Sequence, residues 1–216
     1  MSSRLITICL RKVPRPGTIE AMDAEQVMTL RTLLGSSAWL QQARSFAHAL
    51  RGAAPRTQGG LLIVGTPDEE PWHLAAHLDQ ESRLARIPGL APTLVRWAPP
   101  PDAPPHLRIG LERISSAGRG QALFVVSSQA APPALLERVH DARRVGAMIL
   151  AMDAGDPELD DMAHEAFAVE PGQAPVSFDA AQHLVSAAAG EPSPSRISLR
   201  SRLARLLDTV SGPSEA

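Results

Sequence analysis

Polar side chains follow directly after several short apolar runs of this 216-residue sequence. Hydroxyl and amide groups hydrogen-bond sugars and phosphates, and carboxylates accept hydrogen bonds from sugar hydroxyls. In an open parallel sheet the carboxyl ends of the strands meet at one edge, and ligands bind there. We therefore predict ligand contacts just after the runs LLIV, ALFVV and AMILAM, at Gly65, Thr66, Ser127, Ser128, Gln129 and Asp153.

The loop at residues 65–70 carries three carboxylates in the sequence GTPDEE. A phosphate cradle at a helix N-terminus needs glycines and free backbone N–H groups. Pro67 removes one donor, and carboxylates in a first helical turn satisfy the helix dipole and repel phosphate. We therefore expect a helix capped by its own carboxylates. The loop SSQAAP at residues 127–132 offers two hydroxyls to a ligand, and its residue types are also ordinary in loops and caps.

Acidic residues also cluster after the apolar run AMILAM, at Asp153, Asp156, Asp160 and Asp161. A magnesium ion would use one or two such carboxylates together with ligand phosphates. The pair formed by Asp156 and Pro157 instead matches a helix N-cap followed by proline at the first helical position. No dedicated metal-loop spacing is present, so we favour the cap.

His73 and His77 lie four residues apart, and Glu81 lies one helical turn further on. This spacing places the side chains on one helix face, which a zinc site could use. The segment HLAAH lacks the glutamate that metalloproteases carry beside the first histidine, and a solvated or interfacial helix face accounts for it. We predict no metal site and no cofactor.

Other catalytic and structural motifs are missing from the sequence. It contains no GxSxG elbow and no GxxxxGK[ST] loop, and we nominate no catalytic residue. The single cysteine, Cys9, excludes an intramolecular disulfide and a cysteine-rich zinc site.

A regular alternation of strands and helices is predicted to position the candidate residues. Continuously apolar runs such as LLIVG and ALFVVS indicate strands that are buried on both faces. Alternation with helices indicates βαβ units. We predict a three-layer, doubly wound α/β fold with a five-stranded parallel sheet. The expected strands are 61–65, 93–97, 122–127, 147–152 and 166–169, and the expected helices are 70–86, 107–117, 133–145, 157–164 and 178–188.

Further helices are expected at both ends of the chain. Residues 1–21 carry no period and are predicted to be a disordered tail, with Met22 as an alternative start. A helix is expected from Asp23, followed by a second helix that a serine at residues 36–37 caps. We expect the α/β domain to span residues 22–189. Residues 190–216 are predicted to form a linker and an amphipathic helix near residues 196–210.

Bulk properties exclude several functional classes. With 21 basic and 23 acidic residues the net charge is −2, so we expect no nucleic-acid-binding surface. No apolar run reaches the roughly 18 residues that span a bilayer, and the first residues do not match a signal peptide. We therefore expect no membrane partner and a cytoplasmic location.

The order of elements resembles the SIS (sugar isomerase) domain family over about residues 23–188. The segments ALFVVSSQ, ALLERVHDARRVGAMILAMD and ELDDMAHEAFAVEPG are similar to the family's course of strand, serine-rich loop, helix and strand. The segment VSFDAAQHLVSAA looks like its closing helix. The resemblance implies a flavodoxin-like strand order, a sugar-phosphate ligand and pairing into a homodimer.

The sequence departs from the family pattern at the positions that hold the sugar phosphate. The family carries GxGxS after the first strand, whereas residues 65–67 lack the second glycine and the serine. It carries SxSGxT or similar after the third strand, and here Ser127 matches the first serine while Gln129 and Ala130 replace Ser-Gly. An isomerase also needs a proton carrier. Glu165, Asp179 and His183 are near in sequence, but none lies in a specific motif.

We therefore interpret the chain as a divergent SIS-like domain that is not an enzyme. It would act as a sensor of a phosphosugar or related ligand, or as a self-associating assembly or regulatory module. The alternative is an active phosphosugar isomerase or phosphosugar-binding enzyme. A Rossmann-like nucleotide protein is disfavoured because no GxGxxG follows the first strand. An arginine-rich membrane anchor at the last helix is disfavoured because that helix lacks aromatic residues.

Overall fold

A five-stranded parallel sheet forms the centre of the computed structural model, which describes residues 37–55 and 58–191. The strand order is β2-β1-β3-β4-β5, which is the flavodoxin-like order. This order confirms the predicted doubly wound α/β class. The strands are β1 (Leu61–Val64), β2 (Thr93–Val95), β3 (Ala122–Ser127), β4 (Met148–Asp153) and β5 (Glu165–Ala168).

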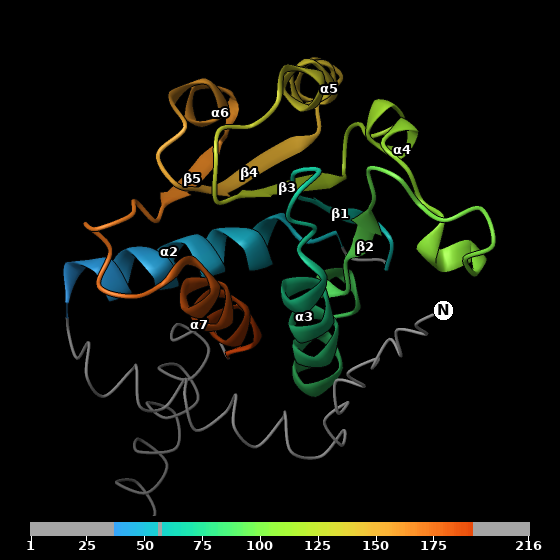
Figure 1. Ribbon diagram of the computed structural model, residues 1–216. Coiled ribbons are helices and arrows are strands. Elements are labelled where there is room, and N and C mark those ends of the chain that lie inside the picture. Colours follow the sequence, from blue (N-terminus) through green and yellow to red (C-terminus); the bar gives the residue numbers. More distant parts are fainter. Residues whose placement is uncertain (1–36, 56–57, 192–216) are drawn as a thin grey trace, which may run out of the picture.

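Helices cover both faces of the sheet (Figure 1). One layer contains α2 (Ala38–Ala53), α3 (Trp72–Ala85) and α7 (Phe178–Gly190). The other contains α4 (Glu112–Ser115), α5 (Pro133–Arg144) and α6 (Pro157–Met162). Two 3₁₀ turns, η1 (Pro88–Leu90) and η2 (Pro105–Leu107), lie in the connections on either side of β2.

Alternating side chains of each strand enter the two layers, because successive residues of a strand point to opposite faces. Phe124 and Val126 pack toward the α2, α3 and α7 layer, while Leu123 and Val125 pack toward the α4, α5 and α6 layer. All six residues of β3 are buried. This two-sided burial explains why the run is continuously apolar.

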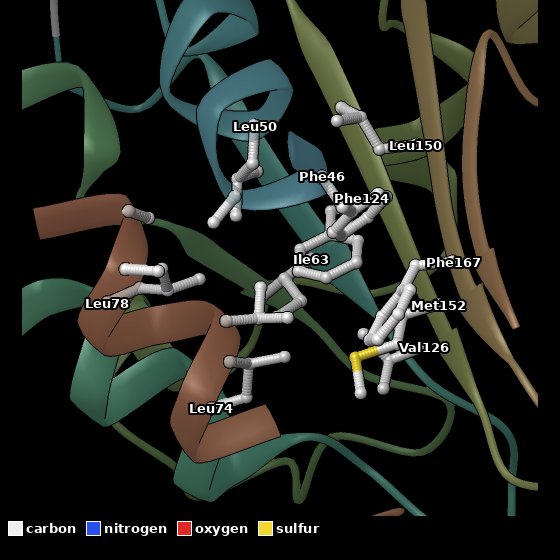
Figure 2. Packing of buried hydrophobic residues seen from close by; sticks show 14 of the residues in the cluster. Phe46, Leu50, Ile63, Leu74, Leu78, Phe124, Val126, Leu150, Met152 and Phe167 are labelled. Carbon is white, nitrogen blue, oxygen red and sulfur yellow. The ribbon is translucent and has the colours of Figure 1, made fainter. Parts of the chain in front are cut away.

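Aromatic residues join α2 to the sheet (Figure 2). The ring of Phe46 lies 5.6 Å from that of Phe124 and 5.8 Å from that of Phe167, centroid to centroid. Ser37 begins the helix, and its Oγ accepts a hydrogen bond from Leu40 N at 3.2 Å. The predicted serine cap is therefore confirmed.

One predicted helix is wrong. Residues 107–117 were expected to be helical, but only the short α4 forms there, after the turn η2. Gly110 instead pairs with Arg96 in an isolated parallel bridge that extends the edge of the sheet beyond β2. The helix α4 begins after this pairing, at Glu112.

The predicted tail at residues 1–21, the helix from Asp23 and the helix near 196–210 lie outside the described residues. Within the described part of the chain, no helix is long and apolar enough to cross a membrane.

Candidate functional site

The strand order places a topological switch point between β1 and β3. The chain passes from β1 to β2 on one side and resumes at β3 on the other. In open α/β sheets the crevice outside the carboxyl ends of such a strand pair is where ligands bind. The predicted contacts Gly65 and Thr66 lie after β1. Ser127 ends β3, and its register partner on β4 is Asp153.

The loop between β1 and α3 folds back on itself at this crevice. Thr66 N donates a hydrogen bond to Glu69 O at 3.1 Å, and Glu69 N donates to Thr66 Oγ1 at 3.2 Å. A Cβ on Gly65 would lie 2.1 Å from Glu69 O and 2.7 Å from Pro71 Cδ. A glycine is required here because the returning loop takes the space of a side chain.

The carboxylate of Glu69 bridges the two loops of the crevice. Ser128 Oγ donates a hydrogen bond to Glu69 Oε2, although 59 residues separate the two in sequence. Ser127 is 1% exposed, and its hydroxyl donates to Gln129 O in the same loop. All three hydroxyls that were predicted to contact a ligand, including that of Thr66, are therefore hydrogen-bonded within the protein.

A second carboxylate holds the end of β2. Glu70 accepts hydrogen bonds from Arg96 Nε at 3.0 Å, Trp97 N at 3.1 Å and Trp72 Nε1 at 3.0 Å. The Arg96 and Glu70 side chains are 17% and 14% exposed, and the Arg96 guanidinium lies 4.6 Å from the Trp72 ring centroid. This arginine is the basic residue directly after β2, and its charge is matched by Glu70.

The expectation of a helix capped by its own carboxylates is wrong. The helix α3 begins at Trp72 after Pro71, and no side chain caps it. The loop carboxylates lie before the first turn and reach the ends of neighbouring strands instead. Glu70 accepts from Arg96 and Trp97 just after β2, and Glu69 accepts from Ser128 just after β3.

Asp153 is fully buried at the end of β4. Its Oδ1 accepts hydrogen bonds from Gly155 N at 2.6 Å and Asp156 N at 2.8 Å. Its Oδ2 and the buried Oδ1 of Asp160 have no donor among the residues that the structure describes. Burial, followed by the charge of Asp153 and a hydrogen bond to it, raises the pKa of Asp160 to about 6. Below that pH, a protonated Asp160 can donate a hydrogen bond to the Asp153 carboxylate.

Asp156, in the same loop, has a structural role. Asp156 Oδ1 accepts hydrogen bonds from Glu158 N and Leu159 N, and Pro157 follows it at the first position of α6. The predicted N-cap is therefore confirmed. Asp156 Oδ2 also accepts from Ala131 N at 2.7 Å, which ties the loop after β3 to α6.

A small cavity lies beside the ends of β4 and β5. Its volume is about 250 Å³, below the range of roughly 300–1,000 Å³ that is usual for ligand pockets. Ser128, Ser177 and Glu170 contribute its polar groups, and no basic side chain lines it among the described residues. Ser177 also caps α7, because its Oγ accepts from Ala180 N at 3.2 Å.

The three residues considered as proton carriers do not converge on this edge. Glu165 begins β5, and it lines a separate groove between α2 and β5. His183 Nε2 lies 3.8 Å from Asp179 Oδ2 within α7, and its ring contacts histidines of α3.

Sequence reasoning missed the partners of Glu69 and Glu70. The available signal was Arg96 and Trp97 directly after β2, since the end of β2 lies beside that of β1. Trp97 Nε1 donates to Gly65 O at 2.8 Å and closes the loop further.

No protein-family model and no curated protein matches this sequence. The fold is similar to the sugar isomerase domain of an RpiR transcription factor from Sphaerobacter thermophilus. That match has a TM-score of 0.49 and 15% identity, over 88% of this chain and 98% of the other. The solved structures that this chain resembles thus include a sugar isomerase domain.

Two other solved structures are similar to this chain, at lower TM-scores. The NanR protein of Vibrio vulnificus, in complex with ManNAc-6P, matches at a TM-score of 0.43 and 12% identity over 90% of this chain and 69% of that chain. A phosphoheptose isomerase from Francisella tularensis matches at a TM-score of 0.41 and 11% identity, over 82% of this chain and 97% of that chain. The chain spans about half of two further matched chains, at 54% and 47% of their lengths.

Proposed function

We propose that this chain is a divergent sugar isomerase-like domain without isomerase activity, which acts as a self-associating assembly or regulatory module. The observation that carries the proposal is the hydrogen bond between Glu69 and Ser128 across the switch point. A carboxylate of the protein occupies the place where a ligand of this fold would approach the strand ends.

The charges around the crevice oppose a sugar phosphate. Phosphate groups are bound by arginine, lysine and backbone N–H groups. Arg96 is paired with Glu70, and Pro67 and Pro71 lack a backbone N–H. A phosphate entering beside Glu69 would therefore meet a like charge and few donors.

The alternative function uses the same carboxylate differently. In an active phosphosugar isomerase, Glu69 would carry a proton between C1 and C2 of the substrate. Its position beside Ser128 at the strand ends is the observation that favours this alternative. The two functions predict opposite results in an exchange experiment.

The experiment is hydrogen exchange at C2 of the sugar. The full chain is incubated with pentose, hexose and heptose phosphates in deuterated water, and the sugars are followed by NMR. We expect no deuterium incorporation above that of a protein-free sample. Incorporation that disappears in Glu69→Gln would establish the enzyme and overturn the proposal.

A groove supports the assembly role. It has a volume of about 750 Å³ and lies between α2 and β5, with Trp39, Gln42 and Glu165 among its lining residues. Within the described residues β5 pairs only with β4, so its outer edge offers unpaired backbone groups. Exposed strand edges are templates for pairing with another chain. We propose a second copy of this chain as the occupant, because a two-fold interface uses the same surface on both copies.

A further inference from the structure

Three histidines from two helices lie together on the α3 and α7 layer. His73 and His77 are one turn apart on α3, and His183 comes from α7. One ring nitrogen from each can be chosen so that all three lie within 4.8 Å of one another. The His77 and His183 ring centroids are 4.6 Å apart, and His73 lies 5.7 Å and 5.8 Å from them.

The packing of α3 explains why its histidines face α7. Leu74 and Leu78 are fully buried in the core beneath the sheet, and each histidine immediately precedes one of them. This places the histidines beside the buried stripe, next to the neighbouring helix. The His183 side chain is 10% exposed, whereas His73 is exposed to solvent. The cluster is therefore buried on the side of His183 and accessible to solvent on the side of His73.

The geometry points to a metal site. We propose that His73, His77 and His183 together bind a divalent transition metal, with Zn²⁺ as the ion of reference. Neutral imidazole nitrogens are common zinc ligands, and three of them leave a fourth tetrahedral position for water. Zinc–nitrogen bonds of about 2.0–2.1 Å place tetrahedral ligand atoms about 3.3 Å apart. Binding would therefore require the rings to move closer together than the present limit of 4.8 Å, and His73 is exposed to solvent.

A carboxylate supports this assignment. Asp179 Oδ2 lies 3.8 Å from His183 Nε2, one turn earlier on α7. Metal-binding histidines commonly donate their second ring nitrogen to a carboxylate, which orients the ring and raises its basicity. Asp179 is placed for that role when the other nitrogen of His183 binds the metal.

This site is independent of the crevice between β1 and β3. It departs from the sequence-based prediction of no metal site, because the spacing of His73 and His77 could not reveal a third candidate ligand on a distant helix. A bound ion would connect α3 to α7 and stabilise the folded chain, since it binds the native state in preference to the unfolded one.

The test is metal binding by the full chain after removal of metal with EDTA. Zn²⁺ binding is measured by calorimetry and by the shift in Tm, and Co²⁺ is added as a spectroscopic probe. We expect one equivalent of Zn²⁺ to bind with a rise in Tm, and Co²⁺ to give the visible absorption of a tetrahedral site. Loss of an outer carboxylate partner commonly costs 10–100-fold in affinity, so His73→Ala and His183→Ala should each cost at least about tenfold.

The control variant is His140→Ala, which removes an exposed histidine of α5 on the opposite face of the sheet. Its affinity for Zn²⁺ should equal that of the unmodified chain. His73 is exposed, so His73→Ala should keep the far-ultraviolet circular dichroism of the native fold. Absence of stoichiometric binding, or equal affinity in His73→Ala and the unmodified chain, would overturn the proposal.

Discussion

Carboxylates dominate the chemistry at the carboxyl edge of the sheet. Glu69 accepts from Ser128 across the switch point, and Glu70 gathers three donors at the end of β2. Asp153 and Asp160 share a buried contact at the end of β4. Each group is positioned by a neighbouring element, so single substitutions can test the arrangement.

Gly65→Ala tests how tightly the loop after β1 is closed. The added Cβ would lie 2.1 Å from the backbone oxygen of Glu69, which cannot move without opening the loop. Overpacking of this kind costs about 1–3 kcal/mol of unfolding free energy, measured by urea denaturation. Gly52→Ala is the control, because a Cβ there meets nothing within 4 Å and α2 gains helix propensity. Equal effects of both changes would contradict the closed loop.

Asp160→Asn tests the shared proton. The folded-state pKa of Asp160 is raised from 3.8 to about 6, so the folded state binds an additional proton between those pH values. The stability that Asp160 contributes is therefore present at low pH and is lost as the pH rises from about 4 to about 6. Asparagine carries no charge and can donate to Asp153, so the variant should be more stable than the unmodified chain above pH 6.

The measurement for Asp160→Asn is urea unfolding at pH 4.5 and pH 7.5. The stability advantage of the variant should be larger at the higher pH. Asp102→Asn, in an exposed loop, is the control and should show no such difference. An advantage for Asp160→Asn that is the same at both pH values would rule out the shared proton.

Helices and strands were largely predictable because their signals are local. Ser37 before an amphipathic run predicted the start of α2, and Asp156 before Pro157 predicted the start of α6. The continuously apolar runs predicted the buried strands. The bond between Glu69 and Ser128 was not predictable, because side-chain partners 59 residues apart depend on the register between strands. The histidine cluster escaped prediction for the same reason.

Phe46→Ala tests how α2 is held on the sheet. Phe46 is 3% exposed and contacts the rings of Phe124 and Phe167. Removing a buried phenylalanine ring typically costs about 3–5 kcal/mol, which chemical denaturation would measure. Arg44→Ala, at an exposed position of the same helix outside the groove, should change stability by less than about 0.5 kcal/mol. A loss below about 1 kcal/mol for Phe46→Ala would show that α2 is not anchored through this ring.

At the scale of the described part of the molecule, an open groove lies between α2 and β5, while the strand-end crevice is bridged by the protein's own side chains. This contrast is the basis for proposing association of two copies. An interface at the groove would cover the outer edge of β5, which the described residues leave unpaired.

Light scattering coupled to gel filtration tests this association. We expect a concentration-dependent dimer, and Gln42→Glu should weaken it at least about tenfold because the groove already contains Glu165 and Glu170. Gln129→Glu makes the same change in the loop after β3 and should leave the dimer intact. A monomer at all concentrations, or equal effects of the two variants, would contradict a dimer through this groove.

The most direct test of the closed crevice is a thermal-shift titration with sugar phosphates. A ligand at 100 times its Kd stabilises the native state by about 2.7 kcal/mol, so binding would give a readily measured increase in Tm. We expect no shift for the unmodified chain or for Asp68→Asn, which removes an exposed charge from the same loop. Glu69→Gln removes the bridging charge, so this variant should show an increase in Tm with a sugar phosphate, unlike the unmodified chain and Asp68→Asn. A saturable shift in the unmodified chain that Ser128→Ala abolishes would show an open phosphosugar site and contradict this account.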